Sequence, residues 1–232
     1  MKTIGMLGGM SWESTQSYYQ AVNEGVKKVL GGLHSAKVVL VSVDFAEIEE
    51  LQHKGDWKKT AEILSGAARA LERAGADFLI ICTNTMHIVA PQISAAISIP
   101  VLHIADATAH ALKSDGISRV GLLGTRFTME QPFYRNRLEE KFDIEVVVPN
   151  EEGRRTVHDV IYRELCLGEI REESKEQILA IIDALEKQGA EAVILGCTEI
   201  ALLVKQYDTG VPLYDTTAIH AQKAVELALE GI

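Results

Sequence analysis

One cysteine stands where the sequence brings together the parts of a reactive site. Cys197 comes two residues after an apolar run that ends at Leu195, and a helix is expected to begin directly after it. The free N–H groups and partial positive charge of a helix start favour an anion, which predicts a pKa for Cys197 below the value of about 8.5 of a free thiol. Such a thiolate would act as a nucleophile or a base. The alternative is a small buried apolar side chain, as free cysteines commonly are.

A second polar segment follows another apolar run. Residues 76–82 are predicted to form a buried strand that leads directly into Thr83, Asn84 and Thr85. Small polar side chains beside the backbone N–H groups of a helix start are suited to bind a carboxylate. Each of these residues taken alone is more often a helix cap.

These two segments occupy equivalent places in an internal repeat. The segments around Gly5, Gly75 and Pro100 are repeated in the same order 116, 114 and 112 residues later. Three similar distances in one order indicate two similar halves. Counted from the matched glycines, Thr83 and Cys197 take the same position in the two halves.

The elements that would position these residues follow an α/β pattern. Short apolar runs alternate with amphipathic segments along the whole chain, as in parallel sheets covered by helices. We predict two pseudo-symmetric αβ domains, residues 1–102 plus 214–232 and residues 103–213, each a mainly parallel sheet flanked by helices. Ligands in such sheets bind beyond the carboxyl ends of the strands, and pockets favour domain interfaces, so we expect the active site in the cleft between the domains.

Individual elements can be placed approximately. Strands are expected at 3–7, 36–45, 76–82 and 100–104, and helices at 12–30, 57–74, from 106 on and at 217–229. Ser11 is a plausible N-cap of the first helix. The turn at Gly8 and Gly9 matches no dinucleotide or nucleoside triphosphate motif. It either holds a small anion such as a carboxylate or only permits a tight turn.

Composition and charge disfavour several classes of function. The 232 residues are 47% hydrophobic and 24% charged, and the formal net charge is −10, which disfavours nucleic acid and anionic membranes as partners. The sequence shows neither a membrane span nor a signal peptide, so a cytoplasmic protein is expected. Cys82, Cys166 and Cys197 form no CxxC pair, which argues against a disulfide framework and a zinc site.

The histidines show no metal-ligand spacing, and no metal is expected. His87 lies nearest to the Thr83 segment, whereas His103 and most of the others are expected at the surface or in caps. His220, in the final helix close to Asp215, either supports a cysteine or has a structural role.

Equivalent strand ends of two related domains would approach one substrate from opposite sides. This suits a reaction that removes a proton from one face of a carbon and returns one to the other face, a racemisation or epimerisation. A thiol with a tuned pKa serves as both acid and base, whereas a threonine hydroxyl is a poor base at neutral pH. Asn84, Thr85 and Thr198 could bind a carboxylate and stabilise an enolate-like charge.

Three motifs together resemble the aspartate/glutamate racemase superfamily, and within it the broad-specificity amino-acid racemase branch. They are GGMSWEST at 8–15, CTNTMH at 82–87 and GCTE at 196–199. The resemblance covers essentially the whole chain. It implies a cofactor-independent two-base enzyme with two domains related by a pseudo-dyad, and commonly a homodimer. The implied substrate is aspartate, glutamate or another amino acid.

The resemblance also implies roles for particular residues. The family's two thiols fall on Thr83 and Cys197, with Cys197 as the base for the L enantiomer. The positions at or near the substrate fall on Met10, Gln52, Asn84, Thr85, Thr125 and Thr198.

The sequence departs from the family pattern at two positions. Thr83 stands where the family has a cysteine, and Cys82 cannot replace it because adjacent strand residues point to opposite faces. We therefore predict α-hydrogen exchange that is faster from the L than from the D substrate, with slow net racemisation. Near Cys166, aspartate-specific relatives tend to place a lysine that pairs with the distal carboxylate, and this chain shows no clear replacement.

Two other functions stay open at this point. A single-cysteine decarboxylase of the same superfamily would release carbon dioxide from a malonate-type acid. A weakly catalytic amino-acid-binding protein would be stabilised thermally by an amino acid without isotope exchange.

Overall fold

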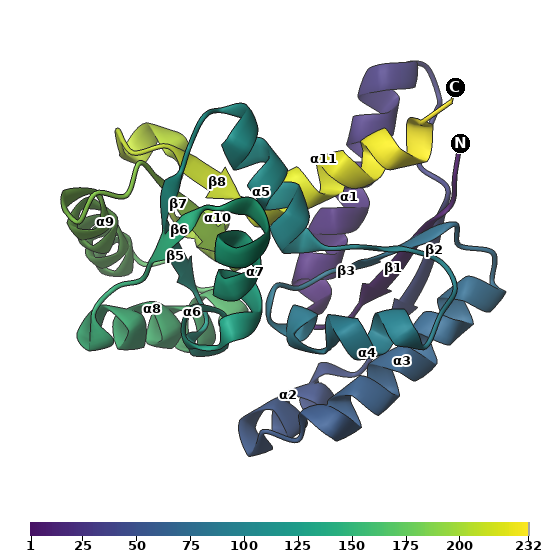
Figure 1. Cartoon of the computed structure of the whole chain (residues 1–232), viewed down its shortest axis with the longest axis horizontal. Coiled ribbons are helices and arrows are strands. Elements are labelled where there is room, and N and C mark those ends of the chain that lie inside the picture. Colours follow the sequence, from purple (N-terminus) through teal and green to yellow (C-terminus); the bar gives the residue numbers. More distant parts are fainter. Residues whose placement is uncertain (232) are drawn as a thin grey trace. The chain divides into compact units, whose positions relative to one another are not determined.

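The computed structural model describes residues 1–231 and divides the chain into two compact units (Figure 1). Residues 1–104 form the first unit together with the residues from His220 on, and residues 105–219 form the second. Each unit contains one four-stranded sheet, and every strand pairing in both sheets is parallel. The predicted α/β class with two mainly parallel sheets is confirmed.

The first sheet has the strand order β2-β1-β3-β4. Its strands are β1 (Ile4–Gly8), β2 (Val38–Ser42), β3 (Phe78–Ile81) and β4 (Val101–Leu102). The unit's helices are α1 (Trp12–Leu30), α2 (Phe45–Lys54), α3 (Trp57–Arg73), the short 3-10 helix η1 (Thr85–Val89) and α4 (Ala90–Ala95). To these the last helix, α11 (Thr216–Leu229), adds its residues from His220 on.

Helices cover both faces of this sheet, because alternate residues of β1 and β3 point to opposite sides. Met6 and Ile80 lie in one apolar core with α1 and α11, and Leu7 and Ile81 lie in another with α2, α3 and α4. All four side chains are fully buried. A parallel sheet that is buried on both faces requires such nearly continuous apolar strands.

The second sheet repeats this plan with the order β6-β5-β7-β8. Its strands are β5 (Arg119–Gly124), β6 (Glu145–Val147), β7 (Ala192–Gly196) and β8 (Leu213–Asp215). The accompanying helices are α5 (Ile104–Ser114), α6 (Arg126–Glu130), α7 (Pro132–Phe142), α8 (Glu151–Arg163), η2 (Leu165–Leu167), α9 (Glu172–Lys187), α10 (Ile200–Leu203) and η3 (Gln206–Asp208). The main core of this unit joins β5 and β7 to α8, α9 and α10.

The registers of the two sheets match the internal repeat. Leu7 pairs with Ile81 in the first sheet, and Leu123 pairs with Leu195 in the second. One and two residues further along, Cys82 corresponds to Gly196 and Thr83 corresponds to Cys197. The strand pairing therefore gives the same correspondence as the spacing of the glycines.

The first long helix begins and ends where the sequence predicts. It spans Trp12–Leu30, the side chain of Ser11 accepts a hydrogen bond from the N–H of Ser14, and Gly31 follows as the C-cap with φ of 73°. Several strands are shorter than expected. The strand expected at 100–104 is limited to Val101–Leu102, because α5 begins at Ile104.

The chain passes between the units at 104/105 and at 219/220, whereas the sequence placed the divisions at 102/103 and 213/214. The second difference has a plain cause. Tyr214 and Asp215 pair with Ile194 and Leu195 of β7, which keeps them in the second sheet. The later part of α11 supplies Ala221 and Val225 to the core of the first unit.

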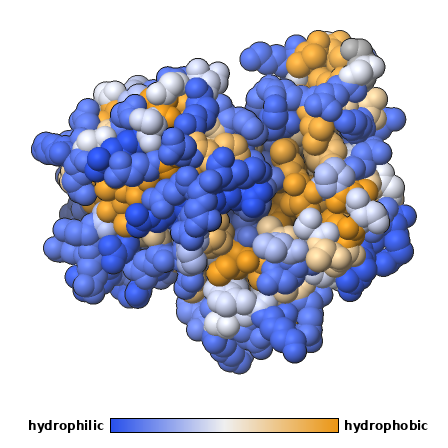
Figure 2. All heavy atoms as spheres, viewed as in Figure 1, coloured by the Kyte–Doolittle hydropathy of each residue, from blue (hydrophilic) through white to orange (hydrophobic). Residues whose placement is uncertain are grey.

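The surface is mainly polar on the face shown in Figure 2, with apolar side chains interspersed. Within residues 1–231, none of the helices combines the length and the apolar character that crossing a membrane requires.

Candidate functional site

Cys197 lies directly after β7, where two strands end close together. Gly124 of β5 and Gly196 of β7 are paired, and a Cβ atom added to Gly196 would lie 2.8 Å from the carbonyl oxygen of Leu123. Only glycine permits this approach. The Cys197 side chain is half-buried and packs against the main core of the second unit.

The thiol of Cys197 is paired with a carboxylate. Its Sγ–H donates a hydrogen bond of 2.9 Å to Oε2 of Glu199, a residue that is only 8% exposed. Burial raises the pKa of Cys197 well above its ordinary value, and the nearby Glu199 charge raises it further. The expectation of a lowered pKa was wrong, because burial and Glu199 shift the pKa of Cys197 in the opposite direction.

The helix after Cys197 also differs from expectation. α10 begins three residues later, at Ile200, and it is four residues long. A dipole of a helix this short is small, and the Cys197 side chain is not at its first turn. The Glu199 carboxylate is therefore the dominant nearby charge, and its sign opposes thiolate formation.

Hydroxyl groups lie beside the cysteine at the ends of β7 and β8. Oγ1 of Thr198 is 3.1 Å from Oγ1 of Thr217, and Oγ1 of Thr216 donates to the carbonyl oxygen of Leu195 at 2.9 Å. Asp215 accepts hydrogen bonds from the first backbone N–H groups of α11, and burial raises its pKa. These contacts fix the strand end on which Thr198 is carried.

Thr125 follows β5 and is buried. Its Oγ1 accepts a hydrogen bond of 3.3 Å from the N–H of Thr128 and so forms the N-cap of α6. The structure thus gives Thr125 a capping role, at the strand end adjacent to Cys197.

Cys166, on η2, packs against the same core as Cys197. The Cys166 side chain also contributes, after burial and Glu199, to the raised pKa of Cys197. Aspartate-specific relatives tend to carry a lysine near this position. A side chain at this position therefore influences the pKa of the Cys197 thiol.

Thr83 occupies the equivalent strand end of the first unit. It is half-buried and comes two residues after β3, whereas Asn84 and Thr85, at the start of η1, are buried. The residue equivalent to Glu199 is Thr85, so the first unit has a hydroxyl where the second has a carboxylate. The two strand ends share a backbone plan but differ in charge.

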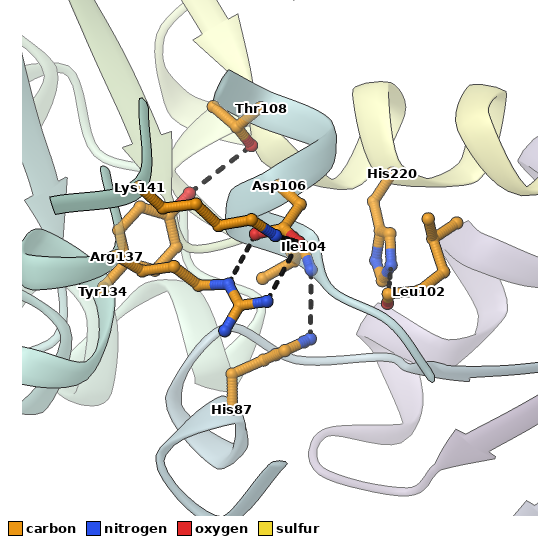
Figure 3. A network of polar contacts seen from close by, with 9 residues as sticks. All are labelled: His87, Leu102, Ile104, Asp106, Thr108, Tyr134, Arg137, Lys141 and His220. Carbon is orange, nitrogen blue, oxygen red and sulfur yellow. Dashed lines mark hydrogen bonds and ion pairs between the residues drawn. The ribbon is translucent and has the colours of Figure 1, made fainter. Parts of the chain in front are cut away.

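His87 is a residue that the sequence placed near the site without a role. Its Nδ1 is 2.8 Å from the carbonyl oxygen of Thr83. Its Nε2 accepts a hydrogen bond of 3.2 Å from the N–H of Ile104 (Figure 3). Burial and the neighbouring rings of His103 and His220 hold the pKa of His87 well below its usual range.

His87, His103 and His220 form a buried cluster in the first unit. The ring centroids of His87 and His103 are 4.5 Å apart, and those of His87 and His220 are 5.9 Å apart. His103 was expected at the surface or in a cap but is only 8% exposed, because it lies directly before α5 with its ring against that of His87. His220 contacts Tyr18 and the carbonyl oxygen of Leu102, which is a structural role.

Cys82 has a different environment from Cys197. It is fully buried in the apolar core between the sheet and α1, and burial raises the pKa of its thiol far above the ordinary value. The hydroxyl of Ser14 donates to its carbonyl oxygen at 3.0 Å. Cys82 points into this core and is not a substitute for a thiol at position 83.

The glycine turn after β1 is filled by protein atoms. The N–H of Gly9 donates to Oγ1 of Thr15 at 2.8 Å, and a Cβ atom on Gly8 would lie 2.4 Å from the Thr15 methyl group. Gly9 has φ of 92°, which favours glycine. Of the two sequence interpretations, these contacts favour a tight structural turn over an anion site.

Met10 and Gln52 are both buried in the first unit. Met10 belongs to the core on the α2 and α3 side of the sheet, and Gln52 is near the end of α2. Among the described residues, no group of three or more His, Cys, Asp or Glu side chains is arranged to hold a metal ion.

Comparisons with known proteins agree with this architecture. The sequence model of the family described as Asp/Glu/Hydantoin racemase matches residues 7–224. The broad specificity amino-acid racemase RacX of Bacillus subtilis (strain 168) is 26% identical over 235 residues, which cover 97% of this chain and 98% of RacX.

Solved structures match over almost the whole chain. A crystal structure of a candidate Asp/Glu racemase from Yersinia pestis is 56% identical, with a TM-score of 0.94, and covers 99% of this chain and 100% of that chain. An aspartate racemase homologue from Pyrococcus horikoshii OT3 is 38% identical, with a TM-score of 0.88 and the same coverage.

The fold and these matches define an enzyme of the cofactor-independent amino-acid racemase class. The chain belongs to the Asp/Glu/hydantoin racemase family. The resemblance that the three sequence motifs indicated is confirmed.

The contacts of Glu199 with Cys197 and of His87 with Thr83 were not expected from the sequence. Glu199 and His87 are both within the motifs, two residues after Cys197 and four residues after Thr83. Two signals were available in the sequence. Glu199 is an acid two residues after the candidate base, and His87 is a histidine about one helical turn after a strand end.

Proposed function

We propose that the protein is an amino-acid racemase in which Cys197 moves the α-proton of the L enantiomer and Thr83 occupies the opposite position. The observation that carries this proposal is the Cys197 thiol, hydrogen-bonded to Glu199 at one strand end of the repeat, with Thr83 at the equivalent end. Membership of the racemase family supplies the reaction class.

A protonated thiol must lose its proton before it can act as a base. Glu199 is positioned to accept that proton, because its Oε2 already accepts the Sγ–H hydrogen bond at 2.9 Å. The transfer leaves a thiolate and a neutral carboxylic acid, so the pair keeps its single negative charge. A zwitterionic substrate brings an ammonium group that favours the negative thiolate.

The thiolate then removes the α-proton from the L face and leaves a planar, enolate-like intermediate. Return of a proton from Cys197 gives the L enantiomer again, and in heavy water this step introduces deuterium with retention. Delivery of a proton to the other face requires Thr83 or a water that Thr83 binds. A hydroxyl is a weaker acid than a thiol, so conversion to the D enantiomer is slower than exchange.

Asn84, Thr85 and Thr198 are proposed to bind the substrate carboxylate, with Met10, Gln52 and Thr125 at or near the substrate. The substrate is proposed to be aspartate, glutamate or another amino acid. We also propose a homodimer, which a measurement of molar mass by light scattering would test.

An α-deuterium exchange screen tests the proposal. Each amino acid is incubated in heavy water as its L and as its D form, and deuterium at Cα and the enantiomer ratio are followed by mass spectrometry and chiral chromatography. We expect exchange with at least one amino acid and its loss in Cys197→Ala. Cys166→Ala is the matched control, since it removes a neighbouring thiol. No exchange with any amino acid, or full activity in Cys197→Ala, would contradict the proposal.

One observation favours a second candidate function. A single thiol at one strand end of the repeat, with a hydroxyl at the equivalent strand end, also suits a decarboxylase that protonates a planar intermediate from one face. Carbon dioxide release from a malonate-type acid, dependent on Cys197, would identify this activity.

A further inference from the structure

His87 can have only one protonation state that satisfies both of its contacts. A backbone N–H is always a donor, so the N–H of Ile104 requires an unprotonated Nε2 on His87. The proton of the neutral ring is then on Nδ1, where it is donated to the carbonyl oxygen of Thr83 at 2.8 Å. Both ring nitrogens are used, and the ring links the Thr83 segment to the first residue of α5.

The surroundings of His87 hold its ring in this orientation. It is 1% exposed and packs edge-on against His103 and His220. His220 is itself fixed, because its Nε2 donates to the carbonyl oxygen of Leu102 and its Nδ1 accepts from the hydroxyl of Tyr18, each at 2.8 Å. A ring that is packed and bonded on both sides restricts the backbone to which it is bound.

The second unit has no equivalent of this ring. The repeat places Ala201 at the position of His87, and the nearest polar partner of Cys197 is the carboxylate of Glu199. His87 therefore acts on one strand end only. A change at His87 is therefore expected to affect conversion of the L to the D substrate, which needs Thr83, more than exchange of the L substrate, which needs only Cys197.

We propose that His87 is a positioning residue that holds the Thr83 carbonyl and thereby sets the place of the Thr83 side chain for proton delivery to the D face. This inference rests on the proposed racemase function. Under this proposal, His87 influences the ratio of two rates: conversion of the L to the D substrate, and exchange of the α-proton with retention of the L configuration.

Two substitutions separate the two hydrogen bonds. In His87→Asn the side-chain amide nitrogen replaces Nδ1 and keeps the donor to Thr83, while the acceptor for Ile104 is lost. In His87→Gln the longer amide reaches the position of Nε2 and keeps the acceptor, while the donor to Thr83 is lost. The readout is the ratio of L-to-D conversion to L exchange in heavy water, which is independent of the amount of active enzyme.

We expect His87→Gln to lower this ratio about tenfold, because misplacement of a reacting group by a fraction of an ångström has effects of this order or larger. His87→Asn keeps the ratio within about threefold of the wild type, since the Thr83 contact persists. His110→Gln is the control: it changes an exposed histidine of α5 whose ring contacts Phe142, and it leaves the ratio unchanged.

An unchanged ratio in His87→Gln, or an equal fall in both His87 variants, overturns the role of His87 while the racemase function stands. Absence of exchange in the wild type overturns the proposed function instead. Should His87→Gln fail to fold, ¹⁵N NMR of the wild type decides the matter. The inference requires a neutral ring protonated at Nδ1 at neutral pH, and a ring protonated at Nε2 overturns it.

Discussion

The strand ends of the two units have the same backbone plan and opposite chemistry. In the second unit a thiol donates to a carboxylate, and this pair carries one negative charge. In the first unit a hydroxyl stands at the equivalent place, its backbone is held by a neutral ring, and the residue equivalent to Glu199 is Thr85. An internal repeat thus preserves the position of a side chain at a strand end, while the neighbouring side chains set the charge around it.

The largest expected effect comes from Glu199→Gln. The amide still accepts the Sγ–H hydrogen bond but does not take the proton, and loss of a proton acceptor of this kind costs about 10² to 10⁴ in rate. Removal of the carboxylate charge lowers the pKa of Cys197 and recovers part of that loss. We expect net L exchange to fall about 100-fold.

Alkylation of Cys197 supplies the second readout for this variant. The pH profile of its reaction with iodoacetamide should shift to lower pH in Glu199→Gln while exchange falls. An exchange rate that rises together with the thiolate fraction would show that Glu199 only suppresses the thiol.

The histidine cluster predicts a loss of stability in mild acid. Burial lowers the pKa of His220 to about 4 from an ordinary value near 6.5. Between these values the unfolded chain binds a proton that the folded protein does not, so the free energy of unfolding falls as the pH falls from 6.5 toward 4. His220 alone accounts for about 2 kcal/mol between pH 7.5 and pH 5.

Urea unfolding at the two pH values measures this contribution. His220→Gln should reduce the difference between the two free energies of unfolding by about 2 kcal/mol. Replacement of the exposed His34 by Gln is the control and should leave the difference unchanged. A pH dependence that is the same in His220→Gln and the wild type would mean that the buried ring is not the source.

The Thr83→Cys change makes the two strand ends more alike. A thiol is a stronger acid than a hydroxyl by more than five pKa units, so proton delivery to the D face should become easier. We expect conversion of L to D substrate to rise about tenfold, with little change in L exchange, because no carboxylate stands at position 85 to accept the proton of the new thiol. Thr83→Ser is the matched control. Equal conversion in Thr83→Cys and the wild type would place another group on that face.

The smallest expected effect is that of Cys166→Ser. The Cys166 side chain contributes to the raised pKa of Cys197 after burial and Glu199. The alkylation profile of Cys197 should therefore move slightly to lower pH, and L exchange should change by less than about threefold. A large loss of exchange would show that Cys166 takes part in the reaction or in substrate binding.

Much of the fold follows from local patterns in the sequence. The first helix is bounded by Ser11 and Gly31 as their capping chemistry predicts, and the repeat of glycines and apolar strands anticipates two sheets with the same strand order. The lengths of short strands such as β4 were not predictable, because the start of α5 at Ile104 depends on tertiary contacts, among them the one with His87.

The positions of Cys197 and Thr83 in the fold were predicted, but the charge beside Cys197 was not. The sequence placed Cys197 and Thr83 at matching strand ends, and the structure finds them there. The pKa of Cys197 depends on burial and on the direction of the Glu199 side chain, which the sequence pattern does not specify. The rings of His87, His103 and His220 come from separate segments of the chain. No local sequence pattern therefore predicted that they form a cluster.

The asymmetry between the two strand ends is tested most directly by the initial rates of α-deuterium incorporation from separate L and D substrate in heavy water. A strong base on one side and a hydroxyl on the other predict faster incorporation from the L enantiomer, with retention of configuration and slow conversion to D. Equal initial rates from both enantiomers would contradict the account.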